Sequence, residues 1–276
     1  MKKLAILFYL VIGISAHAGL AQGSNIVKTE LSQAEIDRII KTFTANEGAF
    51  REALTNYVFN RSATISTIGM GGQVTGVYRR DSFMTFTSDG QRFERITYFP
   101  VPTIKEIDVT PEDLEDLGGV NPFALEPRSV SQYNFTYLGK EKIDDLNLHV
   151  FEIAPKVIPD PKKSKLRLFS GRVWVDDRDL LIVKSKGKAV PEDKKNKYPV
   201  VETWRENVDG KYWFPSYITA DDQLEFDSGY VVHLRMKVTY KDYTEGKTDV
   251  RIMDEEDVPN DPKAKPAASP TPKKPE

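Results

Sequence analysis

The chain contains no cysteine, and this absence excludes several kinds of site at once. It leaves no disulfide, no thiolate nucleophile and no cysteine that a lipid anchor could modify. An exported protein without disulfides must be held together by its own core. That requirement suits a bacterial periplasm better than a eukaryotic extracellular space.

Histidine is nearly as scarce, with three in 276 residues. His17 lies in the leader described below, and neither His149 nor His233 belongs to a motif with a partner residue. The chain also lacks the GxSxG motif of a serine nucleophile and the HExxH motif of a zinc protease. We therefore expect no enzyme activity, no cofactor and no metal site.

The formal net charge is −2, which is too small to indicate nucleic acid as a partner. The longest apolar run is short and lies at residues 4–12, after Lys2 and Lys3 and before the small-residue site around Ala16 and Ala18. This order is typical of a secretory signal peptide. We expect residues 1–21 to be a signal peptide and the mature protein to be periplasmic, in a Gram-negative bacterium.

Residues 259–276 are rich in proline and lysine and contain no aromatic residue. Such a composition cannot bury enough apolar surface to offset the entropy of ordering, so it predicts a disordered tail. Between leader and tail, residues 22–258 have the length of one domain. We expect one β domain there, folded from about Ser32 to Glu255.

One long helix is predicted to begin at Ser32, which forms a capping box with Glu35. Apolar residues then recur at helical spacing and resume beyond Gly48. They are Ile36, Ile39, Ile40 and Phe43, followed by Phe50, Leu54 and Tyr57. This apolar stripe needs a surface to cover. A weaker helical turn is expected between Thr110 and Gly118-Gly119.

Most of the remaining sequence predicts strands. Residues 230–240 alternate strictly between apolar and polar side chains. The apolar set is Val232, Leu234, Met236, Val238 and Tyr240. Asp89-Gly90 and Asp209-Gly210 indicate hairpin turns, and Gly69–Gly72 and Asp176–Asp179 indicate further strand connections. About ten to twelve strands with short links favour an antiparallel meander.

A meander with one amphipathic helix predicts a mainly β fold, in which an antiparallel sheet curls around an apolar concavity and the helix covers it. A two-sheet sandwich is the alternative. We expect the five apolar residues of 230–240 to line a ligand cavity. The helical residues Ile36, Ile39, Ile40 and Phe43 are expected to form its lid.

Four segments in succession resemble one known family. They are Tyr137–Lys156, then Ser170–Asp176, then Leu181–Ser185, and finally Trp204–Pro215, which contains Val-Asp-Gly-Lys-Tyr-Trp-Phe-Pro. The succession is similar to the outer-membrane lipoprotein-sorting proteins, the family of the carrier LolA. Two parts look like additions to a minimal carrier: residues 103–128 and the proline-rich tail.

The resemblance implies a LolA-like half-open barrel that binds lipid or lipoprotein acyl chains, with membrane donor or acceptor proteins as partners. It also implies an arginine that locks the lid, for which Arg79, Arg80, Arg92 and Arg95 are candidates. A sensor of mislocalised lipoproteins on the same fold is one alternative. A carbohydrate-binding or carbohydrate-active β domain is another, with paired acids in a groove flanked by Trp174 or Trp204.

Overall fold

The computed structural model describes residues 25–87, 90–110, 113, 125–164 and 166–246. The predicted signal peptide, the predicted tail and Gly118-Gly119 therefore lie outside the described residues.

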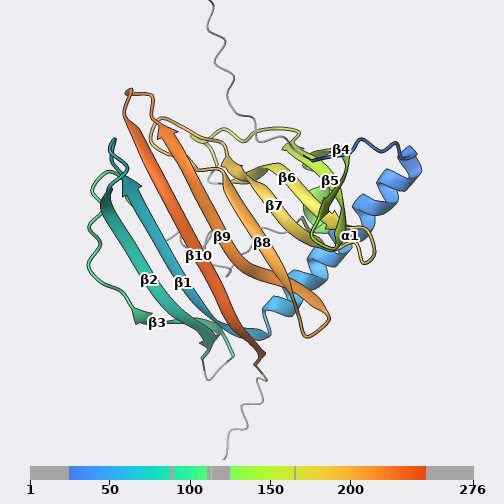
Figure 1. The fold of residues 1–276 in the computed structure, drawn as a ribbon, viewed down its shortest axis with the longest axis horizontal. Helices are drawn as coiled ribbons and strands as arrows, with labels where there is room; N and C mark the ends of the chain where they lie inside the picture. Colours follow the sequence, from blue (N-terminus) through green and yellow to red (C-terminus); the bar gives the residue numbers. More distant parts are fainter. Residues whose placement is uncertain (1–24, 88–89, 111–112, 114–124, 165, 247–276) are drawn as a thin grey trace, which may run out of the picture.

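Ten strands form one antiparallel sheet, in the order β3-β2-β1-β10-β9-β8-β7-β6-β5-β4 (Figure 1). Their bounds are β1 Tyr57–Ile68, β2 Val74–Phe86, β3 Arg92–Tyr98, β4 Tyr133–Ile143, β5 Leu146–Pro155, β6 Leu168–Asp176, β7 Ile182–Val190, β8 Val201–Val208, β9 Tyr212–Glu225 and β10 Val231–Glu245. Since β3 and β4 are the two edges of the sheet, the barrel stays open between them. This confirms the mainly β, half-open fold and excludes the two-sheet sandwich.

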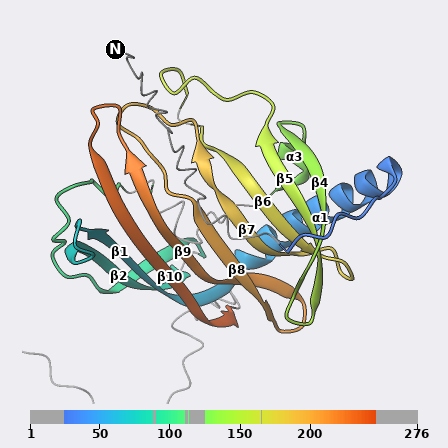
Figure 2. The ribbon, with the colours of Figure 1, turned by 45° about the horizontal axis from the view of Figure 1, so that its top comes forward.

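The long helix α1 spans Gln33–Leu54 and crosses one face of the curved sheet (Figures 1 and 2). Ser32 caps it, because its Oγ accepts a hydrogen bond from the Glu35 N–H at 3.3 Å. The other half of the capping box was predicted wrongly. The Glu35 carboxylate instead accepts from Arg38 at 2.7 and 3.2 Å, a charge-assisted pair that is stronger than a bond to a neutral amide.

Two further details of the helices differ from expectation. Tyr57 is the first residue of β1 and not part of the helical stripe. A short helix, α3, spans Pro127–Val130 just before β4. Within the described residues, no helix has both the length and the apolar character needed to cross a membrane.

The predicted hairpin connections are present where the structure describes them. Asp209 and Gly210 both have positive φ, 55° and 69°, as a type I′ turn requires, and they join β8 to β9. Gly69–Gly72 joins β1 to β2, and residues 177–181 join β6 to β7. Asp89 lies outside the described residues, while Gly90 has φ 81° between β2 and β3.

Two apolar clusters fill the space between α1 and the sheet. Cluster A joins the C-terminal half of α1, at Phe50, Ala53 and Leu54, to β1, β2, β9 and β10. Cluster B joins the N-terminal half, at Ile39 and Phe43, to β4, β5, β6 and β7. A smaller third cluster contains Leu148, Val150, Trp174 and Val183 at alternate strand positions, so it lies on the opposite face of the sheet.

The segment that follows β3 covers much of cluster A, and we call residues 103–109 the strap. Ile104, Ile107 and Val109 pack against the cluster. Thr103 also pairs with the part of β2 that β3 does not reach. Its N–H donates to the Val77 carbonyl and its Oγ1 accepts from the Val77 N–H, at 2.9 Å each. The strap therefore occupies the concave face where the sequence predicted an open cavity.

Candidate functional site

The five apolar β10 residues, Val232 to Tyr240, are buried in cluster A beneath the strap and the end of α1. The predicted lid residues lie elsewhere. Ile39 and Phe43 are buried in cluster B, and Ile36 and Ile40 pack against it half-buried. The structure therefore does not bring the two predicted sets together, because α1 runs across the sheet and meets a different group of strands with each half.

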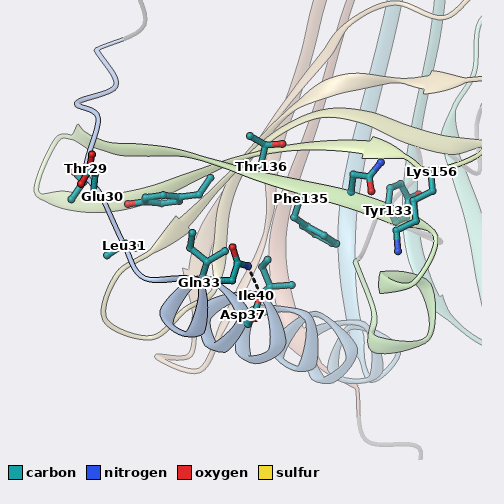
Figure 3. Close-up of a pocket in the computed structure, with 13 residues that line it drawn as sticks. Thr29, Glu30, Leu31, Gln33, Asp37, Ile40, Tyr133, Phe135, Thr136 and Lys156 are labelled. Carbon is teal, nitrogen blue, oxygen red and sulfur yellow. Dashed lines mark hydrogen bonds between the residues drawn. The ribbon is translucent and has the colours of Figure 1, made fainter.

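A groove of about 680 Å³ lies between the first turns of α1 and the edge strand β4 (Figure 3). Its lining includes Ile36 and Ile40 from α1, Leu31 from the segment before the helix, and Tyr133, Phe135 and Tyr137 from β4. None of the five β10 residues lines it. Two of the four predicted lid residues thus border a real groove, and it lies at the open edge of the sheet.

Aromatic side chains of β4 form one wall of the groove. They occupy alternate positions, so they share one face of the strand. Phe135 packs edge-on against Phe43, with ring centroids 6.1 Å apart. The hydroxyl of Tyr133 accepts the backbone N–H of Phe169 at 3.2 Å, which anchors the wall to β6. The sequence carried this signal as aromatic residues alternating with Asn134 and Thr136, but the prediction did not use it.

The rim of the groove is polar. On the helix side, Gln33 donates to the Asp37 carboxylate at 2.7 Å. Glu30 and Lys156 complete the charged lining (Figure 3). An apolar strip with charges at its border suits a ligand with an apolar body and a polar end.

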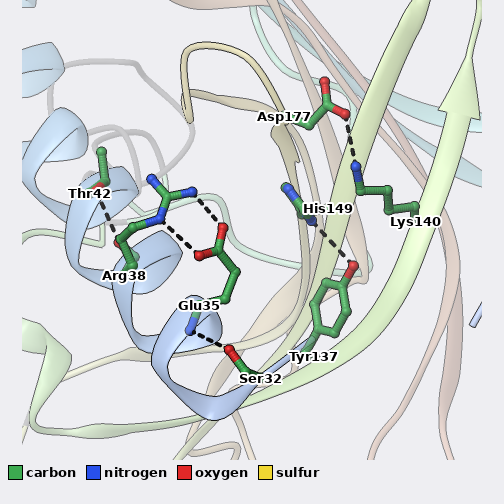
Figure 4. Close-up of polar contacts among 8 residues, drawn as sticks. All are labelled: Ser32, Glu35, Arg38, Thr42, Tyr137, Lys140, His149 and Asp177. Carbon is green, nitrogen blue, oxygen red and sulfur yellow. Dashed lines mark hydrogen bonds and ion pairs between the residues drawn. The ribbon is translucent and has the colours of Figure 1, made fainter. Parts of the chain in front are cut away.

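A buried polar pair supports the aromatic wall from β5. The Tyr137 hydroxyl lies 3.2 Å from Nδ1 of His149, next to the 2.9 Å ion pair of Lys140 and Asp177 (Figure 4). Burial raises the pKa of Tyr137. Burial, followed by the positive charge of Lys140, lowers the pKa of His149, so the imidazole is neutral at neutral pH. His149 therefore has a structural role behind the groove.

The centre of α1 is tied to β8 by a buried ion pair. Arg205 donates to both carboxylate oxygens of Glu47, at 2.6 and 3.1 Å, and its guanidinium lies 4.3 Å from the centroid of the Phe50 ring. Both charged side chains are at most 5% exposed. The prediction missed this pair. Its signal was a carboxylate inside the apolar stripe, between Phe43 and Phe50.

Of the four candidate locking arginines, Arg92 contacts the helix end. It donates to the Leu54 carbonyl at 2.8 Å and to the Tyr57 carbonyl, which satisfies acceptors left at the C-terminus of α1. Arg79 pairs with Asp81, Arg80 pairs with Glu94, and Arg95 lies over the Phe83 ring. Two arginines thus hold α1 in place: Arg205 at its centre and Arg92 at its end.

Two carboxylates of the β6–β7 turn, Asp176 and Asp179, hydrogen-bond within the turn. Asp176 accepts from the Arg178 N–H at 2.7 Å, and Asp179 accepts from the Leu181 N–H at 3.1 Å. Across the described ranges, no group of three or more His, Cys, Asp or Glu side chains is placed to hold a metal ion. His233 pairs with Asp221 on the outer face of β10.

Tryptophan residues on the outer face pack into a row across four strands. Lys184 lies 4.3 Å from the Trp204 ring centroid, and Tyr217 stacks on the same indole at 6.2 Å. Lys184 is on β7 and Tyr217 on β9, so they flank β8 from either side. Trp204 is half-buried and contacts both of these side chains, and Trp174 is buried.

Comparisons with known proteins give matches to solved structures alone. No protein-family model matches the chain, and no curated protein matches it. A DUF1329 family protein from Desulfovibrio piger shares 14% identity, with 73% of this chain and 91% of that chain covered and a TM-score of 0.35. The LolA superfamily protein NE2245 from Nitrosomonas europaea also shares 14% identity, with 74% and 94% covered and a TM-score of 0.32.

A third match is a domain from Vibrio parahaemolyticus, provisionally described as an outer membrane lipoprotein-sorting protein domain. It shares 14% identity, covers 78% of this chain and 95% of that chain, and has a TM-score of 0.33. These matches include the family that the sequence resembles. At this low similarity the likeness carries no inference about function.

Proposed function

We propose that this chain is a non-enzymatic binding or carrier protein of the periplasm, which holds an acyl chain of a lipid or lipoprotein. The observation that carries the proposal is the groove between α1 and β4. Its volume of about 680 Å³ lies within the range of small-molecule sites. Its lining combines aliphatic and aromatic side chains with polar ones, and it lies at the open edge of the sheet, where a long chain can enter from the side.

In this proposal Ile36 and Ile40 contact the acyl chain directly, opposite the aromatic wall of β4. Ile39 and Phe43 hold the helix on cluster B. The five β10 residues support the strap-covered concave face and do not contact the ligand. Lys156 and Glu30 lie at the border, where a polar head group would meet water.

The contacts of α1 differ between its two halves. The polar side-chain contacts that tie the helix to other elements, as far as the structure describes them, begin at Asn46. That residue donates to the carbonyls of Asp179 and Leu180 at 3.0 and 2.9 Å, and Glu47 and Arg51 add ion pairs with Arg205 and Glu126. The first turns rest on apolar contacts, which lack directional constraints. Directed polar contacts therefore hold the centre of α1, whereas packing on cluster B holds its first half.

The test is native mass spectrometry of protein purified from a bacterial periplasm, together with uptake of a fluorescent fatty acid. We expect co-purified lipid or acylated peptide, and saturable uptake. Ile36→Trp fills the groove and should abolish both. Ala34→Trp is the matched control, because Ala34 is exposed and lies on the other side of the same helical turn.

The result that would contradict the proposal is a wild-type protein that is free of ligand and takes up no fatty acid. Equal loss of uptake in Ile36→Trp and Ala34→Trp would also count against the groove as the site.

A further inference from the structure

Large apolar side chains are exposed at one end of the sheet, on connections that are far apart in the sequence. We call the end that carries the β1–β2, β5–β6, β7–β8 and β9–β10 connections the loop rim (Figures 1 and 2). Its exposed side chains include Met70, Val157, Ile158, Leu166, Tyr230 and Val231. Ile158 is 59% exposed and Val157 is 77% exposed. Such a concentration at one end marks an interaction surface.

Strand pairing places these connections next to one another. Ile68 pairs with His233, which brings the β1–β2 and β9–β10 connections together. Leu168 pairs with Val190, which brings the β5–β6 and β7–β8 connections together. The 3.1 Å ion pair of Lys197 and Asp227 joins the β7–β8 loop to the β9–β10 turn. The exposed apolar residues therefore belong to one continuous rim.

Lysines are interleaved with these apolar side chains. Lys162, Lys163, Lys194 and Lys195 are all exposed on the β5–β6 and β7–β8 loops. Two nearby acids, Asp160 and Asp193, keep their charge while they hydrogen-bond to backbone N–H groups of these loops, and the four lysines outnumber them. Asp160 accepts the Lys162 N–H at 3.0 Å, and Asp193 accepts the N–H groups of Lys195 and Asn196 at 2.7 and 2.8 Å.

The opposite end of the sheet differs from the loop rim in the length and in the charge of its connections. Its connections are short turns that carry acids, among them Asp144, Asp145, Asp177 and Asp209. The charge of the molecule is therefore polarised along the strands, with exposed lysines at the apolar end. A negatively charged surface would attract the loop rim and repel the turns.

We propose that the loop rim docks on the surface of a bilayer that contains anionic lipids. Apolar side chains on the loops would enter the boundary between head groups and acyl chains, and the lysines would meet the lipid phosphates. This arrangement is the one that binds proteins peripherally to membranes. The inference uses other residues than the acyl groove, so each stands or fails separately.

Vesicle flotation with the full chain tests the proposal. We expect binding to vesicles of phosphatidylglycerol and phosphatidylcholine, and much weaker binding to phosphatidylcholine alone. Val157→Asp with Ile158→Asp should weaken binding to the anionic vesicles by at least about tenfold. Lys194→Gln and Lys195→Gln should each weaken it by about fivefold, an effect that falls as salt is added.

Val27→Asp is the matched control, since Val27 is 68% exposed but lies on the β4 edge away from the rim. It should bind like the wild type, and so should Ile36→Trp, whose groove does not include the rim. Absence of binding to anionic vesicles would overturn the proposal. Equal weakening by Val27→Asp would overturn it as well, and so would tight binding to a membrane protein in vesicles whose bare lipid is not bound.

Discussion

Glu47 and Arg205 form a buried ion pair between α1 and β8. Removing two charges from water is costly, and their mutual attraction offsets that cost only when the geometry is good. Here the fork of the guanidinium meets both carboxylate oxygens, and the Phe50 ring covers its face. The pair therefore fixes where the centre of α1 lies on the sheet.

Glu47→Gln is expected to lower the free energy of unfolding by about 3 kcal/mol, because it leaves the Arg205 charge buried without its counter-ion. Glu47→Met combined with Arg205→Met should recover much of that loss, since apolar side chains of similar size avoid the desolvation cost. Urea unfolding measures both. Glu35→Gln, in an exposed pair with Arg38, is the control and should change stability little.

His149 is the second residue whose state matters, because it supports the Tyr137 wall of the groove. Burial lowers its pKa below the ordinary value of 6.5, so the folded protein binds its proton less tightly than the unfolded chain does. The stability that the neutral imidazole provides is complete above about pH 6.5 and is lost as the pH falls through the folded-state pKa.

We predict that acidification from pH 7.5 to pH 5 destabilises the wild type more than His149→Gln, which cannot titrate. Unfolding curves at the two pH values give the difference. An NMR titration should place the pKa of His149 below the ordinary histidine value of 6.5. Identical pH dependence in the wild type and the variant would contradict the prediction.

At the scale of elements, two segments pack on the concave face of the sheet. The C-terminal half of α1 contributes residues to cluster A, and Ile104, Ile107 and Val109 of the strap pack against it. The strap approaches β2 so closely that a Cβ added at Gly76 would lie 2.6 Å from Cα of Ile104. Gly76 is therefore needed because the backbone approaches it, and the strap is an integral part of the fold.

Two glycine substitutions should have opposite effects for this reason. Gly76→Ala is expected to displace the strap and to speed trypsin cleavage after Lys105. Gly48→Ala, where the nearest atom is at an ordinary 3.5 Å, should stabilise α1 by about 0.5–1 kcal/mol. Limited proteolysis and thermal unfolding measure the two effects. A Gly76→Ala protein with an intact strap would show that the strap packs less tightly than described.

At the scale of the whole molecule, three regions of one open sheet differ in character. They are the packed concave face, the groove at the β4 edge, and the loop rim with its lysines and exposed apolar side chains. The described side chains of the concave face pack together as a core. Val238, at its centre, is completely buried among side chains of cluster A. Interiors of this kind tolerate added volume poorly.

Val238→Phe should therefore lower the free energy of unfolding by about 1–3 kcal/mol and leave acyl binding per folded molecule unchanged. Val231→Phe is the matched control on the same strand, at a half-exposed position, and should have little effect. Thermal unfolding and fatty-acid uptake would be measured together. A Val238→Phe protein that is fully stable but no longer binds fatty acid would contradict this prediction. It would indicate that the ligand binds at the concave face.

The sequence by itself determined the local features of this protein. Ser32 sets the start of α1, the alternation of Val232 to Tyr240 sets the faces of β10, and Asp209-Gly210 sets a hairpin. Each depends on contacts within a few residues or on a repeat of two or 3.6 residues. Combined, they predicted an antiparallel meander covered by a helix, because short turns favour pairing between consecutive strands. The half-open barrel was implied by the family resemblance.

Only the tertiary structure decided what each face contacts. The strap fills the predicted cavity, α1 divides its stripe between two clusters, and Arg205 reaches Glu47 across 158 residues of sequence. A periodic pattern predicts that a side chain is buried, but it does not predict which element packs against it. That depends on the angle at which α1 crosses the sheet and on the path of an irregular segment, and neither is encoded by local spacing.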